Sequence, residues 1–182
     1  MSKEIYDKGI IKSSAIFDED NEGNRFRYVL ERIWDKNEDK PMVSVIMFNP
    51  SYADGLRYDY TSMKIINYLI DKGECRGVYI LNLYPIIKST RDDVKGDIKK
   101  LSIKENNKSI IDSINMSSKV YFAWGSNTNN KRRIEDVINN LMVNGFKFAN
   151  LLVNDKGESI HPSRCTIFGE EEKELKKYIL EL

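Results

Sequence analysis

Apolar residues gather in four short runs along this chain, and each of the first three ends at a proline or glycine, which interrupts strand structure. The first run, residues 43–48, is almost wholly apolar and stops at Asn49-Pro50, where proline fixes φ and lacks a backbone donor. The other runs cover residues 77–85, 119–125 and 148–153. Runs rich in β-branched and aromatic residues are typical of strands buried on both faces, as in a parallel sheet.

Segments with a helical pattern separate these runs. Apolar residues at helical spacing share one face of a helix predicted over residues 62–72, with Thr61 as its N-cap. Residues 26–34 partly alternate in polarity and predict a strand, with a short helix as the alternative, and an edge strand is expected near residues 10–17. Further helices are predicted over residues 98–114, 129–143 and 169–182.

Strands that alternate with helices indicate βαβ units, in which helices cover both faces of a sheet. We therefore expect a single α/β domain over residues 1–182. Its architecture is predicted to be three-layer α/β/α, with a central, mostly parallel sheet of about four strands. The polar residues 1–24 are expected to form a loosely packed N-terminal extension.

The charge balance gives no overall attraction to nucleic acids or membranes, because 29 Lys and Arg residues face 28 Asp and Glu residues. A binding surface of that kind must be local, and a charge run such as Lys131-Arg132-Arg133 is more often a solvated face. The 2 cysteines form no CxxC pair, and no long apolar segment is present. These features favour a cytoplasmic protein that does not enter membranes.

Polar residues follow the ends of the predicted strands. If the strands are parallel, Asn49, Asn82, Trp124-Gly125 and His161 all lie at one edge of the sheet, where α/β proteins bind ligands. Two asparagines and the only histidine then line one pocket. For each residue taken alone, the alternative is a turn-forming role beside proline or glycine. Their shared position at one edge favours the pocket.

Other common chemistries lack their motifs. The chain has no GxxxxGK[ST] or GxGxxG loop for phosphates, and neither Ser51 nor Ser163 stands in a GxSxG elbow. A single histidine with scattered acids disfavours a catalytic metal site, although Asp54 and Asp59 are candidate ligands of a hard cation. Turn and helix-cap roles are the commoner use of such aspartates.

Two family resemblances follow from these motifs. The order of an apolar strand ending in Asn-Pro, then Val-Tyr-Ile-Leu-Asn-Leu, then Val-Tyr-Phe-Ala-Trp-Gly, then His-Pro-Ser is similar to that of the uracil-DNA glycosylase superfamily. Over nearly its whole length the chain also resembles the DUF1643 family, which has no assigned function. The motifs that carry this second resemblance are residues 25–34, 48–54, 59–61, 82–84, 124–125 and 161–162.

The glycosylase resemblance implies a role for each matching residue. Asn49 would position or activate water, and Phe48 or Tyr52 would stack on a base flipped out of DNA. Asn82 would read the pyrimidine edge with its amide donor and acceptor. His161 would hydrogen-bond the departing base and stabilise its negative charge.

The same resemblance implies where DNA is bound. Ser163 and Arg164 fall on the loop that enters the minor groove and fills the space left by the extruded nucleotide. Lys131 and Arg132 are expected to contact phosphates. The superfamily has glycine where Ser51 stands here and proline where Arg164 stands.

These observations lead to one expected function and two alternatives. We expect a monofunctional, monomeric DNA glycosylase that needs no cofactor and excises an altered or hypermodified pyrimidine, with a role in defence against phages whose DNA carries modified bases. Asp54 and Asp59 would then line the pocket or act as an auxiliary acid. The first alternative is a module that binds a nucleotide or modified base without cleaving it. The second is a phosphoester hydrolase that uses Asp54 and Asp59 with a divalent metal.

Overall fold

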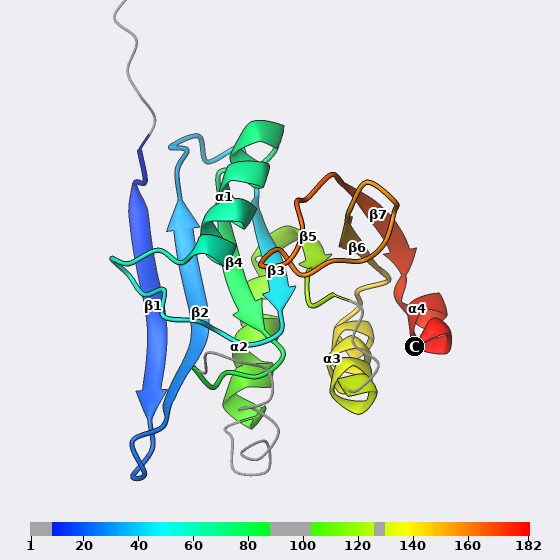
Figure 1. Ribbon diagram of the computed structural model, residues 1–182, viewed down its shortest axis with the longest axis horizontal. Coiled ribbons are helices and arrows are strands. Elements are labelled where there is room, and N and C mark those ends of the chain that lie inside the picture. Colours follow the sequence, from blue (N-terminus) through cyan, green and yellow to red (C-terminus); the bar gives the residue numbers. More distant parts are fainter. Residues whose placement is uncertain (1–8, 88–102, 126–129) are drawn as a thin grey trace, which may run out of the picture.

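The computed structural model describes residues 9–87, 103–125 and 130–182. Within these ranges the strands form one seven-stranded sheet in the order β1-β2-β4-β3-β5-β6-β7 (Figure 1). The strands are β1 (Lys12–Glu19), β2 (Arg25–Ile33), β3 (Met42–Met47), β4 (Gly77–Asn82), β5 (Ser117–Phe122), β6 (Phe148–Val153) and β7 (Gly169–Glu174). The helices are α1 (Tyr60–Lys72), α2 (Ile103–Asn115), α3 (Lys131–Val143) and α4 (Leu175–Glu181).

The four apolar runs form the centre of this sheet. They are β4, β3, β5 and β6, which lie side by side and pair in parallel, as the sequence predicts. The sheet is nevertheless larger than the predicted four strands and is mixed, because β1, β2 and β7 add antiparallel pairings at its two sides. Strands β1 and β2 occupy the two N-terminal segments in which strands were predicted.

Strand β7 corrects the prediction of one continuous helix from residue 169 to the C-terminus. Residues 169–174 pair with β6 along its whole length, and only Leu175–Glu181 are helical. The local pattern of charged residues suits a helix, but the exposed edge of β6 offers backbone donors and acceptors that this segment can satisfy. Tertiary context therefore decides the structure here.

The starts of the other helices also differ in detail. Helix α1 begins after Asp59, not Thr61: the Asp59 carboxylate accepts a hydrogen bond from the Ser62 backbone N–H at 2.7 Å, and Gly73 ends the helix with φ 68°. Residues 98–102 and 129, which were predicted to be helical, lie outside the described residues.

Apolar side chains cover both faces of the sheet and give three layers. On one face lie α1 and the loop after β6, which contribute Ile65, Leu69 and Ile160 to a shared core (Figure 1). On the other face lie α2, α3 and α4, with Ile114, Ile138 and Leu175 among their core residues. None of the described helices combines the length and the apolar character that a membrane span requires.

The strand order creates a crevice at one end of the sheet. After β3 the chain passes through α1 to β4 on one side, whereas β5 lies on the other side of β3 and leads through α3 to β6. Connections that diverge in this way leave an opening beyond the carboxyl ends of the strands, the usual ligand position in α/β folds. We call the end at which β3, β4, β5 and β6 stop the carboxyl edge.

Candidate functional site

The carboxyl edge brings the ends of the parallel strands level with one another. Met47 pairs with Asn82, and the backbone N–H of Tyr84 donates to the Phe48 carbonyl at 3.0 Å. On the other side of β3, Ala123 N–H donates to the Ile46 carbonyl at 2.8 Å. The expected arrangement of β3, β4 and β5 is therefore present.

Gly125 follows the end of β5 and packs closely against the loop that carries His161. Its φ is +76°, and a Cβ at this position would lie 3.1 Å from the His161 backbone nitrogen and 3.3 Å from the His161 Cβ. Only glycine adopts this conformation without strain and leaves room for so close an approach. The Trp-Gly and His-Pro motifs, far apart in sequence, thus meet through this glycine.

Ser163 determines which nitrogen of the His161 ring carries the proton. The Ser163 Oγ lies 2.7 Å from His161 Nδ1, and the Ser163 backbone N–H donates to the same nitrogen at 3.3 Å. A nitrogen that accepts from a backbone N–H carries no proton itself. The neutral imidazole therefore carries its proton on Nε2, where it is a hydrogen-bond donor.

Lys64 of α1 anchors the same loop from the opposite side. Its Nζ donates to the carbonyls of Pro162 at 2.9 Å and Cys165 at 3.3 Å, and lies 4.5 Å from the centre of the Tyr60 ring. Sequence reasoning missed this residue because a lysine on the polar side of an amphipathic helix carries no distinguishing signal. The contacts make Lys64 a positioning residue for the loop.

A cavity of about 320 Å³ opens beside His161. Its volume falls in the range of roughly 300–1,000 Å³ that small-molecule sites occupy. Of the residues predicted to act in the site, it contains His161 and Arg164, whereas Ser163 is exposed beside it. We call it the His161 cavity; its lining residues are Gly125, Asn154, Glu158, Ser159, Ile160, His161, Arg164 and Cys165.

Asn82 is fully buried, and Arg27 of β2 holds its amide. Arg27 Nη2 donates to Asn82 Oδ1 at 3.3 Å, and Nη1 donates to the Ala53 carbonyl at 2.9 Å. Within the described ranges Asn82 Nδ2 has no hydrogen-bond partner. Asn82 thus offers a donor at this point, while the acceptor expected to read a base is engaged by Arg27.

Arg27 is itself a buried cation, which the sequence did not indicate. Burial lowers its pKa to about 10, an effect that the charge of Asp59 partly opposes. The β1–β2 register shifts so that Tyr28 is passed over, and Arg27 therefore faces the α1 side of the sheet. A bulge of this kind leaves no mark in a simple alternating pattern, so the arginine looked like an ordinary strand residue.

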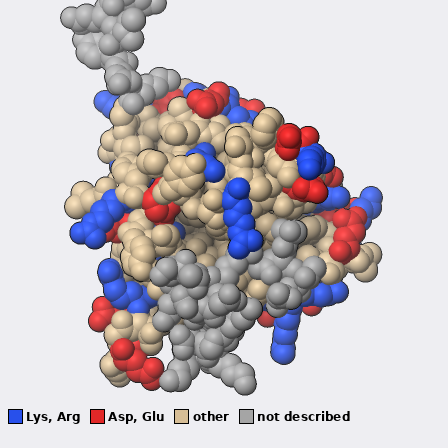
Figure 2. Space-filling view, in the orientation of Figure 1, with Lys and Arg blue, Asp and Glu red and all other residues tan. Residues whose placement is uncertain are grey.

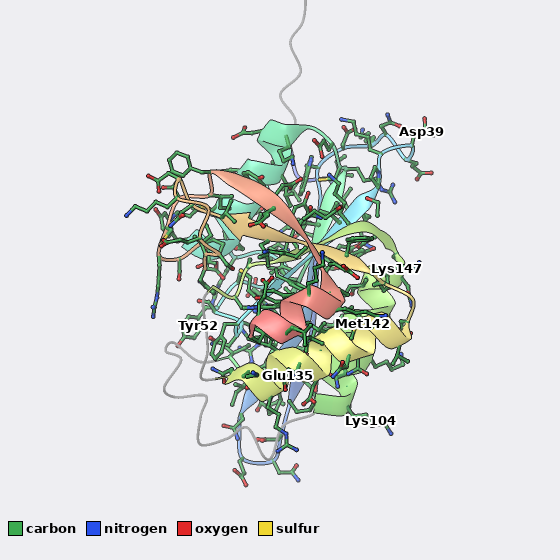
Figure 3. All side chains as sticks on the ribbon, turned by 90° about the vertical axis from the view of Figure 1, so that its right-hand side faces the viewer. Asp39, Tyr52, Lys104, Glu135, Met142 and Lys147 are labelled. Carbon is green, nitrogen blue, oxygen red and sulfur yellow. The ribbon has the colours of Figure 1, made fainter. Side chains whose placement is uncertain are left out.

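The structure separates the residues expected to stack on a base. Phe48 is buried in the core and packs edge-to-face against Tyr84, with ring centres 5.3 Å apart. Tyr52 is 66% exposed and lies at the periphery of the molecule (Figure 3), where it lines a second cavity of about 240 Å³. Asn49 is half-buried, and its Nδ2 donates to the Pro50 carbonyl at 3.2 Å.

The carboxylates of Asp54 and Asp59 accept hydrogen bonds from nearby backbone N–H groups. Asp54 Oδ1 accepts hydrogen bonds from the N–H groups of Arg57 at 2.7 Å and Leu56 at 2.8 Å, which holds the pKa of this carboxyl below its usual value. Asp59 caps α1. In the part of the chain that the structure describes, no group of three or more His, Cys, Asp or Glu side chains is arranged to hold a metal ion.

The basic run at the start of α3 is only partly solvated. Lys131 and Arg132 are exposed, whereas Arg133 is 6% exposed and its Nε donates to the Leu83 carbonyl at 2.7 Å. The expectation of a solvated face is therefore wrong for Arg133. Over the face shown in Figure 2, Lys and Arg side chains are interspersed with Asp and Glu, in keeping with the net charge of +1.

Comparison with known proteins places the chain in a family. No curated protein and no solved structure matches it. The model of one protein family, described as a protein of unknown function (DUF1643), matches residues 27–163. This range runs from the buried Arg27 to Ser163 beside the histidine ring and covers well over half of the 182 residues. The chain therefore belongs to the DUF1643 family.

Proposed function

We propose that this protein is a monofunctional DNA glycosylase, similar to the uracil-DNA glycosylase superfamily, that hydrolyses the N-glycosidic bond of an altered or hypermodified pyrimidine flipped out of DNA. The observation that carries the proposal is the state of His161. Ser163 holds Nδ1 as an acceptor, so the ring is a neutral donor at Nε2 at the carboxyl edge of the sheet. A role in defence against phages with modified bases belongs to the same proposal.

A donor of this kind suits the chemistry of base release. As the bond between the sugar C1′ and the base nitrogen breaks, the electron pair leaves with the base, and the sugar becomes an oxocarbenium-like cation. A hydrogen bond from His161 Nε2 stabilises the charge that develops on a base oxygen. Water then adds to C1′ and gives up a proton, which the departing base or the solvent takes. Asn49, at the end of β3, positions that water.

Asn82 and Arg27 supply recognition in this proposal. Since Arg27 engages Asn82 Oδ1 and Nδ2 has no partner in the described ranges, Nδ2 is the group of this amide that would donate to a ligand. The base must therefore present an acceptor, such as a ring carbonyl, to this residue. A buried donor without a partner rejects a ligand that lacks the matching acceptor, which is the physical basis of strong discrimination.

Base release provides the direct test. The protein is incubated, without added metal, with duplexes and phage DNAs that contain uracil, hydroxymethylcytosine or glucosylated hydroxymethylcytosine, and free base and abasic sites are measured by mass spectrometry. We expect His161→Ala to slow release by at least about a hundredfold, the effect of losing one donor to a developing anion. Asn82→Ala is expected to slow release strongly too, because the donor that recognises the base is lost.

Asn139→Ala serves as the control, because this amide is exposed on α3 and should leave release unchanged. Release that persists in His161→Ala would contradict the proposal.

A module that binds modified bases without cleaving them is the second candidate. The Oδ1 atoms of Asp54 and Asp59 already accept hydrogen bonds from backbone N–H groups, and the residue assigned to position water is Asn49, whose amide cannot act as a general base. Binding of modified DNA without release of base from any substrate, with affinity retained in His161→Ala, would favour this module over the enzyme.

A further inference from the structure

Arg133 is a buried cation whose two terminal nitrogens have no hydrogen-bond partner in the described structure. Its side chain is 6% exposed, and its Nε donates to the Leu83 carbonyl at 2.7 Å. Both Nη1 and Nη2 are buried and have no hydrogen-bond partner in the described ranges. Burial lowers its pKa to about 10, an effect that Tyr84 and Asp136 only partly oppose, which reflects the cost of holding this charge away from water.

Among the residues that the structure describes, the other two buried arginines differ from Arg133, because their terminal nitrogens make hydrogen bonds. Arg27 donates through one Nη to the Ala53 carbonyl and through the other to Asn82. Arg32 donates from Nη1 to the Glu31 carbonyl and from Nη2 to the Asp54 carbonyl. Both therefore use their terminal nitrogens to brace the chain around residues 53–57. Arg133 has an equivalent contact at Nε alone, and its forked end has no such structural use.

The helix on which Arg133 stands adds further positive potential. Helix α3 has 13 residues, and its N-cap Asn130 makes no side-chain hydrogen bond to the first turn, because its Oδ1 accepts from the Tyr84 hydroxyl at 2.9 Å. The first turn has no acidic residue and begins with Lys131 and Arg132. Cations oppose the dipole at a helix N-terminus, whereas an anion there is stabilised by free N–H groups.

We propose that the N-terminal end of α3 is a phosphate-binding site built around Arg133, and that its ligand is a backbone phosphate of the DNA strand that carries the flipped base. The identity of the ligand rests on the proposed function. The planar guanidinium can donate two parallel hydrogen bonds to phosphate oxygens, and the helix N–H groups complete the site.

The location agrees with this role. Arg133 contacts Leu83, the residue after Asn82, so the site borders the carboxyl edge. Figure 3 shows α3 running from Glu135, on the side of Tyr52, to Met142, on the side of Lys147. The start of the helix thus lies on the same side of this view as the loop after β3.

The free protein should gain stability when Arg133 is replaced by a side chain of similar length without charge. In Arg133→Met the Leu83 carbonyl keeps its second donor, Asn106 Nδ2, at 3.2 Å. The substitution therefore removes a buried charge whose terminal nitrogens lack hydrogen bonds and leaves the Leu83 carbonyl with a partner. We expect Arg133→Met to fold and to melt at a higher temperature than the wild-type protein in phosphate-free buffer.

Ligand binding should show the opposite effect. Inorganic phosphate, compared with chloride at equal ionic strength, is expected to raise the melting temperature of the wild-type protein and to shift the Arg133 Nε–H resonance. Arg133→Met should show no rise in melting temperature with phosphate.

The affinity of Arg133→Met for a single-stranded oligodeoxynucleotide is expected to be lower than that of wild type by about tenfold or more, the equivalent of one charge-assisted hydrogen bond. The slope of log affinity against log salt should fall by about 1. Lys147→Met changes an exposed base between the far end of α3 and β6; it is the matched control and should behave as wild type.

Methylphosphonate substitution of single linkages identifies the phosphate. One linkage whose neutralisation weakens binding to wild type but not to Arg133→Met supports the proposal. Phosphate binding that no DNA linkage reproduces overturns the backbone ligand in favour of a phosphate monoester. An unmoved Arg133 resonance together with wild-type salt dependence in Arg133→Met overturns the site. Absence of base release with an intact phosphate effect refutes the glycosylase alone, so the two failures are distinguishable.

Discussion

Ser163 determines which ring nitrogen of His161 carries the proton. Its hydroxyl and its backbone N–H both contact Nδ1, and together they favour the tautomer protonated at Nε2. Ser163 touches the ring and not the reacting atoms, which makes it a positioning residue in the proposed reaction. Its effect should therefore appear in the state of the ring before any substrate is bound.

We expect Ser163→Ala to lower the rate of base release by about tenfold, because one of the two hydrogen bonds to Nδ1 is lost. Nitrogen NMR of the His161 ring should show a mixed tautomer population, and Ser163→Thr should restore both the tautomer and the rate. A fully retained Nε2 tautomer with a tenfold slower reaction would show that Ser163 acts in another way.

The two cysteines differ in reactivity because they differ in environment. Cys75 is 2% exposed, and burial raises the pKa of its thiol to about 11, so it stays protonated at pH 8. Cys165 is partly exposed and lines the His161 cavity. We expect N-ethylmaleimide at pH 8 to modify Cys165 alone, as seen by intact mass and peptide mapping, and to block base release by filling the cavity.

Cys165→Ser should resist this inactivation while keeping its activity. Modification of Cys75 in the folded protein, or an active enzyme with Cys165 fully labelled, would contradict this account of the cavity.

At the scale of structural elements, Gly125 links β5 to the histidine loop. Gly125→Ala places a side chain in the left-handed region, at a cost of about 1–2 kcal/mol. It also places a Cβ 3.1 Å from the His161 backbone nitrogen. Gly145→Ala is a matched control, because Gly145 has φ +90° but nothing within 4 Å of the added Cβ.

Urea denaturation should show a loss of stability in both glycine variants, whereas only Gly125→Ala should also lose base release and shift the His161 resonances. Equal activity in the two variants would mean that the close approach of Gly125 to His161 has no functional role.

The parallel core was accessible to sequence reasoning because its strands are buried on both faces, and continuous apolar runs such as residues 43–48 record that burial. Since four parallel strands stop at one edge, the positions of Asn82 and His161 relative to the sheet followed. The same patterns did not predict that Arg27 and Arg133 are buried. Arg27 depends on a bulge in β2, and Arg133 follows two exposed bases in a run that appears solvated. Partners distant in sequence determine both, and local patterns do not record them.

The sheet has two outer strands, β1 and β7, and each has one side without a strand partner in the described structure. Such edges can pair with another chain. The β7 sequence is GEEEKE, and Glu171 and Glu172 are exposed. Like charges along an edge repel a second copy of the same edge, which is consistent with the expected monomer.

We expect the wild-type protein to sediment as a monomer over a wide concentration range, and Glu171→Thr/Glu172→Thr to associate as concentration rises. Threonine removes the repulsion between copies and favours extended structure, so both changes promote pairing at this edge. Analytical ultracentrifugation measures the effect, and high salt should weaken the difference because the barrier in the wild-type protein is electrostatic. Lys176→Thr/Lys177→Thr on α4 is the control, since these exposed residues follow the strand and lie off its edge. A double glutamate variant that stays monomeric would show that the geometry of the edge, and not its charge, prevents association.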